Sequence, residues 1–269
     1  MSAEGVRLAA PSFVISCAVL AFWLVVAGTW RWFGLDPFEN TGVRLAPPSA
    51  EHWFGTDRIG RDVFARVLAG AEPVILGGLV GAVIATGLGS CLGMIAGYRR
   101  GWVEQVLMRV FDVFLALPAM VLLLVVVAAF GASPFVLSIA IGVLFAPGIA
   151  RVLRAETLAE TAKDYVTSAR AQGERSLRIM THELLPNVWP QILVQATLTL
   201  AGAVFVSTSL SFLGLASTPP SPDWGLAVSE NRAYLQGAWW TLAFPALAIV
   251  SLVVAVVLVG DHLKEVVRR

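Results

Sequence analysis

Six long apolar stretches constrain what this chain can fold into. They are residues 13–32, 74–98, 106–130, 134–152, 189–213 and 240–260. Each has about the 20 residues that an α-helix needs to cross the hydrocarbon core of a bilayer. Because lipid offers no partner for backbone polar groups, such stretches form helices rather than open strands. The sequence therefore predicts an all-α membrane protein with six transmembrane helices.

The composition supports this class, with 57% hydrophobic residues, 14% charged residues and a mean hydropathy of +0.78, outside the range of soluble domains. The first stretch is longer than a signal-peptide core and lacks a clear cleavage site, so we expect a retained membrane anchor. Cys17 and Cys91 each lie inside an apolar stretch and are interpreted as free thiols. The net charge of +1 says nothing about partners, and we expect no nucleic acid among them.

Local signals predict how the helices are arranged. Gly77, Gly81, Gly89 and Gly93 are spaced as small residues are where membrane helices pack closely. Pro118 is expected to kink the third helix. Residues 131–133 leave room only for a tight hairpin before the fourth.

Basic residues are distributed unevenly between the two sides of the predicted bundle. Of the 19 Lys and Arg residues, 13 fall on the side that carries both termini and residues 164–187, and the other six fall on the opposite side. Since basic residues accumulate on the cytoplasmic side of membrane proteins, we expect both termini to be cytoplasmic.

A polar stretch on this cytoplasmic side combines small residues with a glycine that can end a helix. Thr167, Ser168 and Ala169 are followed by Gly173, and the segment continues to a Leu-Leu-Pro-Asn sequence that ends at Asn187. We expect a short helix that ends at Gly173, because glycine adopts the positive φ of a helix C-cap without strain. A second amphipathic helix is predicted over residues 176–183.

This stretch, written ARAQG…LLPN, resembles the EAA loop of ABC-importer permeases, and most closely that of the dipeptide and oligopeptide branch. In that family the loop docks into a separate ATPase. The resemblance implies a coupling site made by a set of nine residues: Tyr165, Thr167, Ser168, Ala169, Arg170, Ala171, Gly173, Leu185 and Pro186. Thr167 stands where the family has its namesake glutamate, so the ion pair of that glutamate is in doubt here.

The outer loop carries a second resemblance to peptide-permease subunits, in the pattern GTDxxGRDVxxRxxxGA that begins at Gly55. From Asp62 onward, Val63, Phe64 and Val67 share one helical face, which predicts an amphipathic helix lying in the membrane interface. The charged residues of this loop are either merely solvated or contact an external binding protein. The candidates for that contact are Asp57, Arg58, Arg61 and Asp62.

A third resemblance lies in the last outer loop, LGLxxxPPxPxWG, whose prolines favour an extended path. Interfacial tryptophans alone would explain such a loop. In peptide permeases it faces the binding protein and the translocation mouth. Pro219, Pro220, Trp224 and Arg232 are the candidate residues here.

These resemblances cover most of the chain and imply a type I ABC-importer permease, with residues 1–72 as anchor and outer loop and residues 73–269 as the core permease domain, including the coupling loop at about 155–187. The implied partners are a homologous permease subunit, two ATPase subunits, an external solute-binding protein and a peptide substrate. The implied location is the bacterial or archaeal cell membrane.

The chain itself is predicted to perform no chemistry. A Walker A motif needs Gly-Lys-Ser or Gly-Lys-Thr, but Lys163 follows Ala162 and Lys264 follows Leu263. ATP and Mg²⁺ are therefore expected in the ATPase subunits, and no cofactor in this chain. The three histidines have no metal-ligand spacing, so we expect no metal site.

Two other transport classes remain as alternatives. An ion-coupled secondary transporter would need ionisable groups deep in the membrane, and Asp112 is the one acid placed to test this. Its i, i+3 spacing from Arg109 favours a structural ion pair instead. A passive channel would leave the 167–186 pattern unexplained.

Overall fold

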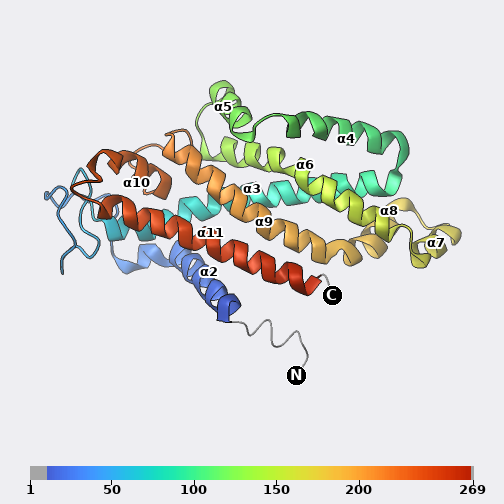
Figure 1. The fold of residues 1–269 in the computed structure, drawn as a ribbon, viewed down its shortest axis with the longest axis horizontal. Coiled ribbons are helices and arrows are strands. Elements are labelled where there is room, and N and C mark those ends of the chain that lie inside the picture. Colours follow the sequence, from blue (N-terminus) through green and yellow to red (C-terminus); the bar gives the residue numbers. More distant parts are fainter. Residues whose placement is uncertain (1–10, 268–269) are drawn as a thin grey trace.

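The computed structural model describes residues 11–267, which form a bundle of long helices (Figure 1). The elements in order are α2 (Pro11–Thr29), η1 (Trp30–Phe33), α3 (Val63–Arg99), α4 (Gly101–Ala116), α5 (Ala119–Phe130), α6 (Pro134–Glu160), α7 (Asp164–Ala171), α8 (Ser176–Arg178), η2 (Ile179–Leu184), α9 (Leu185–Phe212), α10 (Trp224–Asn231), η3 (Arg232–Tyr234) and α11 (Trp240–Val267). The all-α prediction is confirmed.

Five helical segments are long and apolar enough to cross a membrane: Pro11–Phe33, Val63–Arg99, Pro134–Glu160, Ser176–Phe212 and Trp240–Val266. The sixth predicted span is present as a broken pair. Helices α4 and α5 meet at an angle of 89°, because Leu117 is extended and Pro118 follows it. Proline disfavours a helical conformation in the residue before it. The predicted kink is therefore a complete break.

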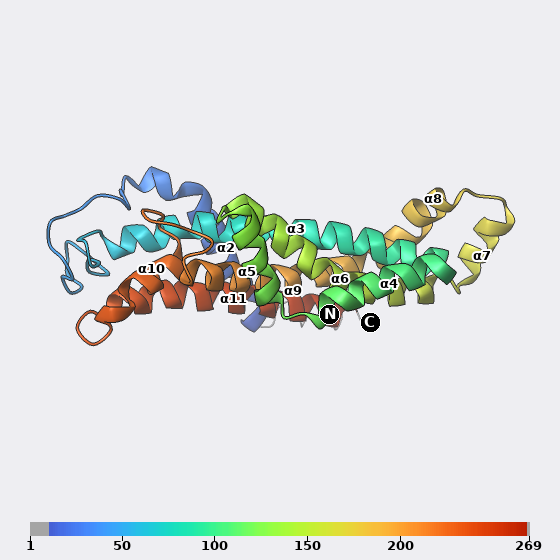
Figure 2. The same cartoon turned by 90° about the horizontal axis from the view of Figure 1, so that it is seen from above.

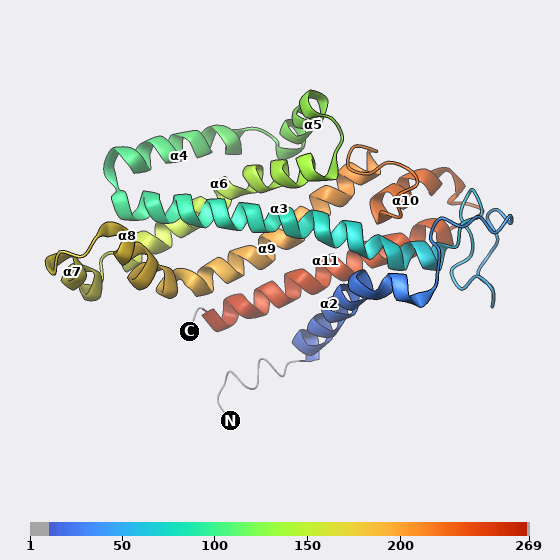
Figure 3. The same cartoon turned by 180° about the vertical axis from the view of Figure 1, so that it is seen from behind.

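Helices α3, α6, α9 and α11 lie side by side, with α2 against α11 and the α4–α5 pair beside α6 (Figures 1 and 3). The α3–α6 contact is very close. A Cβ at Gly89 would lie 2.6 Å from Cβ of Ile149, and a Cβ at Gly93 would lie 2.5 Å from the carbonyl oxygen of Ala150. The prediction that these glycines serve helix packing is confirmed.

The predicted interfacial helix after Asp62 is wrong. Residues 63–69 are the first turns of α3, which continues without interruption past Pro73 to Arg99. Val63, Val67 and Ala69 are buried, and so is Arg66. The segment is therefore an internal part of the bundle, because its polar side chains find partners inside the protein. The expected domain boundary at residue 72 falls within this same helix.

The two ends of the bundle differ in construction. At one end, the loop that precedes α3 lies beside α10; at the other, α7 and α8 project beyond the long helices (Figure 2). A separate hydrophobic cluster lies beneath each end. The two groups of predicted site residues belong to these opposite ends.

Candidate functional site

The predicted coupling segment begins with α7, which is anchored by its apolar side. Val166 is fully buried and Ala169 is 8% exposed, in one cluster with Ile179, Leu184 and Val188. Side chains of the remaining face are exposed, namely those of Thr167, Ser168, Arg170 and Ala171. The outer surface of α7 thus includes these four residues, while Ala169 packs inward.

The turn after α7 is fixed by Gly173, whose φ is +77°. The Gly173 N–H donates to the carbonyl of Arg170 at 3.0 Å, and the Glu174 N–H donates to that of Ala169 at 3.1 Å. This pair of bonds is the Schellman motif. The predicted C-cap is confirmed, and the space around Gly173 is open, so its constraint is conformational rather than steric.

Two polar contacts connect α7 to its surroundings. The Tyr165 hydroxyl donates to Glu160 at 2.8 Å, and Lys163 Nζ lies 2.6 Å from the same carboxylate. Burial and this hydrogen bond raise the pKa of Tyr165 to about 12. The guanidinium of Arg170 lies 4.8 Å from the ring centre of Tyr98 at the end of α3. These contacts fix α7 relative to both α6 and α3.

Leu185 and Pro186 lie at the start of α9, not in a separate loop. The amphipathic helix predicted over residues 176–183 is instead α8 and a π-helical turn, Ile179–Leu184, that run directly into α9. Pro186 is exposed and occupies the first turn of α9, where its missing N–H removes a donor from the preceding turn. Leu185 is half-buried against the cluster under α7.

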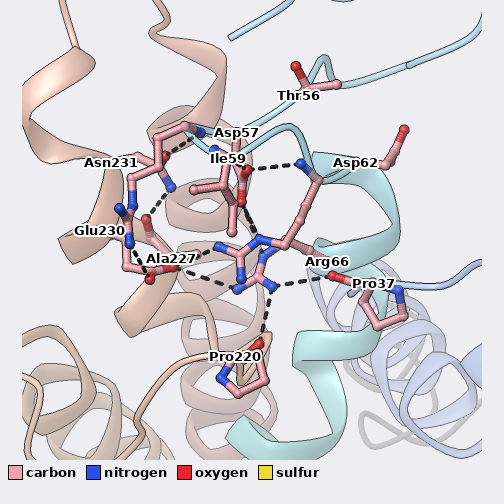
Figure 4. A network of polar contacts seen from close by, with 12 residues as sticks. Pro37, Thr56, Asp57, Ile59, Asp62, Arg66, Pro220, Ala227, Glu230 and Asn231 are labelled. Atoms are coloured by element: carbon pink, nitrogen blue, oxygen red, sulfur yellow. Dashed lines mark hydrogen bonds and ion pairs between the residues drawn. The ribbon is translucent and has the colours of Figure 1, made fainter. Parts of the chain in front are cut away.

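At the opposite end, a buried charge network joins the outer loop to α10 (Figure 4). Arg61 Nε donates to Asp57 at 2.7 Å, and its Nη2 donates to Glu230 at 2.9 Å. Arg58 also donates to Glu230 at 2.9 Å. Arg66 lies 3.8 Å from Asp57. The two pairs with Glu230 bring together segments some 170 residues apart.

Arg66 extends the network to the last outer loop. Its guanidinium donates to the backbone carbonyls of Pro37 and Pro220 at 3.3 Å and of Ser221 at 2.8 Å. Nearby, Asp62 caps α3 by accepting from the Ala65 N–H and contacts His52 at 2.8 Å. The network therefore fixes three loop segments to the start of α3.

Three of the eight predicted external contact residues are not on the surface. Asp57 is 1% exposed, Arg61 is 3% exposed and Trp224 is fully buried. Trp224 donates its ring N–H to the carbonyl of Val67 at 2.7 Å. The expectation that these three face a binding protein is therefore wrong, because their partners lie inside the chain. Arg58 and Asp62 are half-buried, whereas Pro219, Pro220 and Arg232 are exposed.

The predicted Arg109–Asp112 pair is also wrong. Asp112 pairs with Arg151 of α6, with 2.8 Å between Nη2 and Oδ1, and Arg154 pairs with Glu104 of α4. Sequence reasoning missed Glu230, Glu104 and Arg151 as partners. An acid in the mainly apolar stretch of α10 was the available signal for Glu230.

A membrane-embedded helical bundle with a packed helix projecting at one end and braced loops at the other has the construction of a transport permease. Residues 89–269 match the family described as the binding-protein-dependent transport system inner membrane component. The chain belongs to this family and is an integral membrane protein.

Curated relatives are similar over nearly all of the chain. It is 38% identical over 226 residues to the dipeptide transport system permease DppC of Alkalihalophilus pseudofirmus, covering 84% of this chain and 74% of that protein. It is 36% identical over 257 residues to the probable D,D-dipeptide permease DdpC of Escherichia coli, covering 95% and 86%. The glutathione permease GsiD of Pectobacterium atrosepticum is 34% identical over 265 residues, covering 97% and 86%.

Among solved structures, a chain of the inward-facing methionine ABC transporter MetNI superposes with a TM-score of 0.62 at 19% identity. The superposition covers 76% of this chain and 97% of that one. This likeness shows the type I importer permease fold.

Proposed function

We propose that this chain is a permease subunit of an ATP-driven peptide importer and that α7 is its docking element for a partner ATPase. The observation that carries this proposal is the construction of α7: one side is packed into the bundle, while Thr167, Ser168, Arg170 and Ala171 are exposed on a projecting end (Figure 2). A helix held in this way transmits displacement instead of absorbing it.

Contacts within the chain provide the route for that displacement. Val166 and Ala169 share a hydrophobic cluster with Leu153 of α6 and Val188 of α9. Arg100, between α3 and α4, donates to the Thr161 hydroxyl at 3.0 Å. A push on α7 would therefore move the ends of α3, α6 and α9 together. Alternating access needs two packings of such a bundle that differ by a few kcal/mol.

The proposed substrates are short peptides, in line with the names of the relatives. A binding protein delivers them to the outer end, and a homologous permease subunit completes the pathway. Two ATPase subunits that hold ATP and Mg²⁺ dock at the end carrying α7. The excess of basic residues at that end supports a cytoplasmic location for it and for both termini.

The test is the substitution Gly173→Val in the complete transporter. Valine at a φ of +77° is strained and would disrupt the Schellman turn. We expect membrane insertion to persist, while peptide uptake and substrate-stimulated ATP hydrolysis are lost and ATPase copurification is weakened. Gly131→Val is the matched control, because Gly131 has a φ of +87° and open space around it, but lies in the α5–α6 turn.

The two variants separate coupling from general backbone strain. If Gly173→Val keeps normal uptake and normal stimulation of ATP hydrolysis, α7 is not the coupling element. Equal loss of ATPase copurification in Gly131→Val would also contradict the proposal, since that turn does not contact α7.

A further inference from the structure

A patch of five aromatic side chains joins the loop of residues 34–62 to the starts of α3 and α11. Phe54 of the loop stacks on Phe244 of α11, with 3.8 Å between the ring centres and 7° between the ring planes. Phe64, at the start of α3, lies 5.0 Å from the rings of both Trp53 and Phe54, and Trp239 lies 6.2 Å from Phe244. Trp53 and Trp239, at the two ends of this aromatic patch, are 65% and 54% exposed. The patch is thus packed at its centre and open at both ends.

Two further contacts hold the loop on the start of α11. The ring N–H of Trp240 donates to the carbonyl of Thr56 at 3.3 Å. Gly55 has a φ of +71°, and a Cβ at this position would lie 2.6 Å from Nε1 of Trp240 and 2.5 Å from the carbonyl oxygen of Ala46. Glycine therefore allows an approach that a side chain would block. The position of Trp53 relative to α11 is fixed by this packing.

The start of α11 coincides with one edge of an apolar stretch. Residues 240–260 carry no charged side chain and, at about 1.5 Å per residue, span roughly 31 Å. This length matches the hydrocarbon core of a bilayer, which is about 30 Å thick. Asp261 and Lys264 follow at the other edge. Trp239 and Trp240 therefore lie where the hydrocarbon meets the lipid headgroups, at the end of the bundle opposite α7 (Figure 1).

Helix α2 reaches the same level. It runs antiparallel to α11 (Figure 3), and the ring N–H of Trp23 donates to the Ser251 hydroxyl at 2.9 Å. Nine residues after Trp23 comes Trp32, which is 83% exposed, and nine residues before Ser251 comes Leu242. Trp32 and Leu242 therefore stand at about the same level. This boundary thus carries exposed tryptophans from α2, from the loop and from the start of α11.

The ring N–H groups of the two exposed tryptophans of the patch have no acceptor in the chain. Those of Trp23, Trp224 and Trp240 donate to protein oxygen atoms, whereas neither Trp53 nor Trp239 makes a hydrogen bond through its ring within residues 11–267. Tryptophan is enriched at membrane interfaces because its ring is apolar and its N–H is polar. A phosphate or ester oxygen of a lipid headgroup is the kind of acceptor that these two N–H groups lack.

We propose that the aromatic patch holds the loop of residues 34–62 in the lipid headgroup region and that Trp53 is the residue of the loop that enters it. The partner is the phospholipid surface, since an apolar ring with a free N–H at the edge of the hydrocarbon matches its chemistry. Residues 56–61 follow directly and include Asp57 and Arg61 of the charge network. The patch therefore sets the height of that network above the bilayer. This inference goes beyond the proposed function and does not depend on the transported substrate.

The test measures the depth of residue 53 in the complete transporter in phosphatidylcholine vesicles. A nitroxide spin label is attached to Trp53→Cys in a chain with Cys17→Ser and Cys91→Ser, and its collisions with O₂ and with a nickel chelate are compared. O₂ concentrates in lipid, whereas the chelate stays in water. Because the neighbouring residues still fix the backbone, we expect the ratio of O₂ to chelate collisions to equal that of the same label at Trp239→Cys, which marks the boundary.

Two substitutions show whether the ring stack holds the loop at this depth. Phe54→Ala removes the stack on Phe244, so the ratio at residue 53 should fall severalfold. The ratio at residue 239 should stay unchanged, which shows that the bundle is intact. Phe38→Ala is the matched control, because Phe38 is 48% exposed in the same loop and contacts no other aromatic ring within residues 11–267. It should change neither ratio.

Four outcomes would overturn the proposal. A ratio at residue 53 well below that at residue 239 would place the loop in water. A label that neither reagent reaches would mean that a partner subunit covers the patch. Loss of O₂ collisions at residue 53 when the peptide-loaded binding protein is added would make the patch a protein-docking surface. An unchanged ratio at residue 53 in Phe54→Ala would contradict the role of the ring stack. Since none of these outcomes concerns ATPase docking by α7, the proposed function would stand in each case.

Discussion

Asp223 shows how one residue can organise the last outer loop. Its carboxylate caps α10 by accepting from the Leu226 N–H at 3.1 Å, and it also accepts from the hydroxyls of Ser211 at 3.0 Å and Ser217 at 3.1 Å. Burial raises its pKa above the ordinary value of 3.8, and these hydrogen bonds oppose the shift. The loop is thus fixed to the end of α9 by an acid that is costly to ionise.

The sign of this shift gives a pH prediction. The folded protein binds this proton more tightly than the unfolded chain does. The contribution of Asp223 to the free energy of unfolding is therefore largest below pH 3.8 and falls as the pH rises through the folded pKa. Asp223→Asn keeps a capping oxygen but does not titrate. We expect its Tm relative to the unsubstituted protein to rise between about pH 4 and neutrality. Asp223→Ala should lose about 1–2 kcal/mol. A Tm difference that changes in the opposite direction would contradict this reading.

At the scale of elements, the close packing of α3 against α6 is central to the stability of the bundle. At Gly89 a Cβ would also lie 2.7 Å from the carbonyl oxygen of Ala146, so Gly89→Ala must separate the two helix backbones. We expect a loss of about 1–3 kcal/mol, measured by thermal unfolding in detergent. Gly87→Ala, two residues away on the same helix and with no atom within 4 Å, should be neutral or slightly stabilising. Equal effects of the two substitutions would argue against close packing.

Long helices were predictable because apolar length and glycine spacing are local signals. The Gly173 turn was predictable for the same reason. By contrast, Arg151, the partner of Asp112, and Glu230, the second partner of Arg61, lie on distant helices, and a single sequence carries no signal of their proximity. The interfacial helix was predicted because Val63, Phe64 and Val67 share one helical face and the charged Arg66 does not. Arg66 is nevertheless buried, through partners at residues 57, 220 and 221 that only the tertiary fold brings near.

At the scale of the whole molecule, the buried charge network and the exposed surface of α7 lie at opposite ends of one bundle (Figure 1). The buried network holds the loop segments on the start of α3 and the end of α10. The α7 end presents an exposed surface on a packed base. Long, closely packed helices connect the two ends. Because packed interiors are stiff, a displacement at one end would be transmitted to the other.

Site-directed crosslinking tests the central claim, ATPase docking by α7, most directly. Ser168 is exposed on α7, and Ser49 is exposed in the outer loop at the opposite end. In chains with Cys17→Ser and Cys91→Ser, we predict that Ser168→Cys, carrying a photoactivatable maleimide, crosslinks to a copurifying ATPase subunit, whereas Ser49→Cys does not. If Ser168→Cys gives no crosslink in an ATPase-containing complex, or if Ser49→Cys gives the same product, the account of α7 as the coupling element is contradicted.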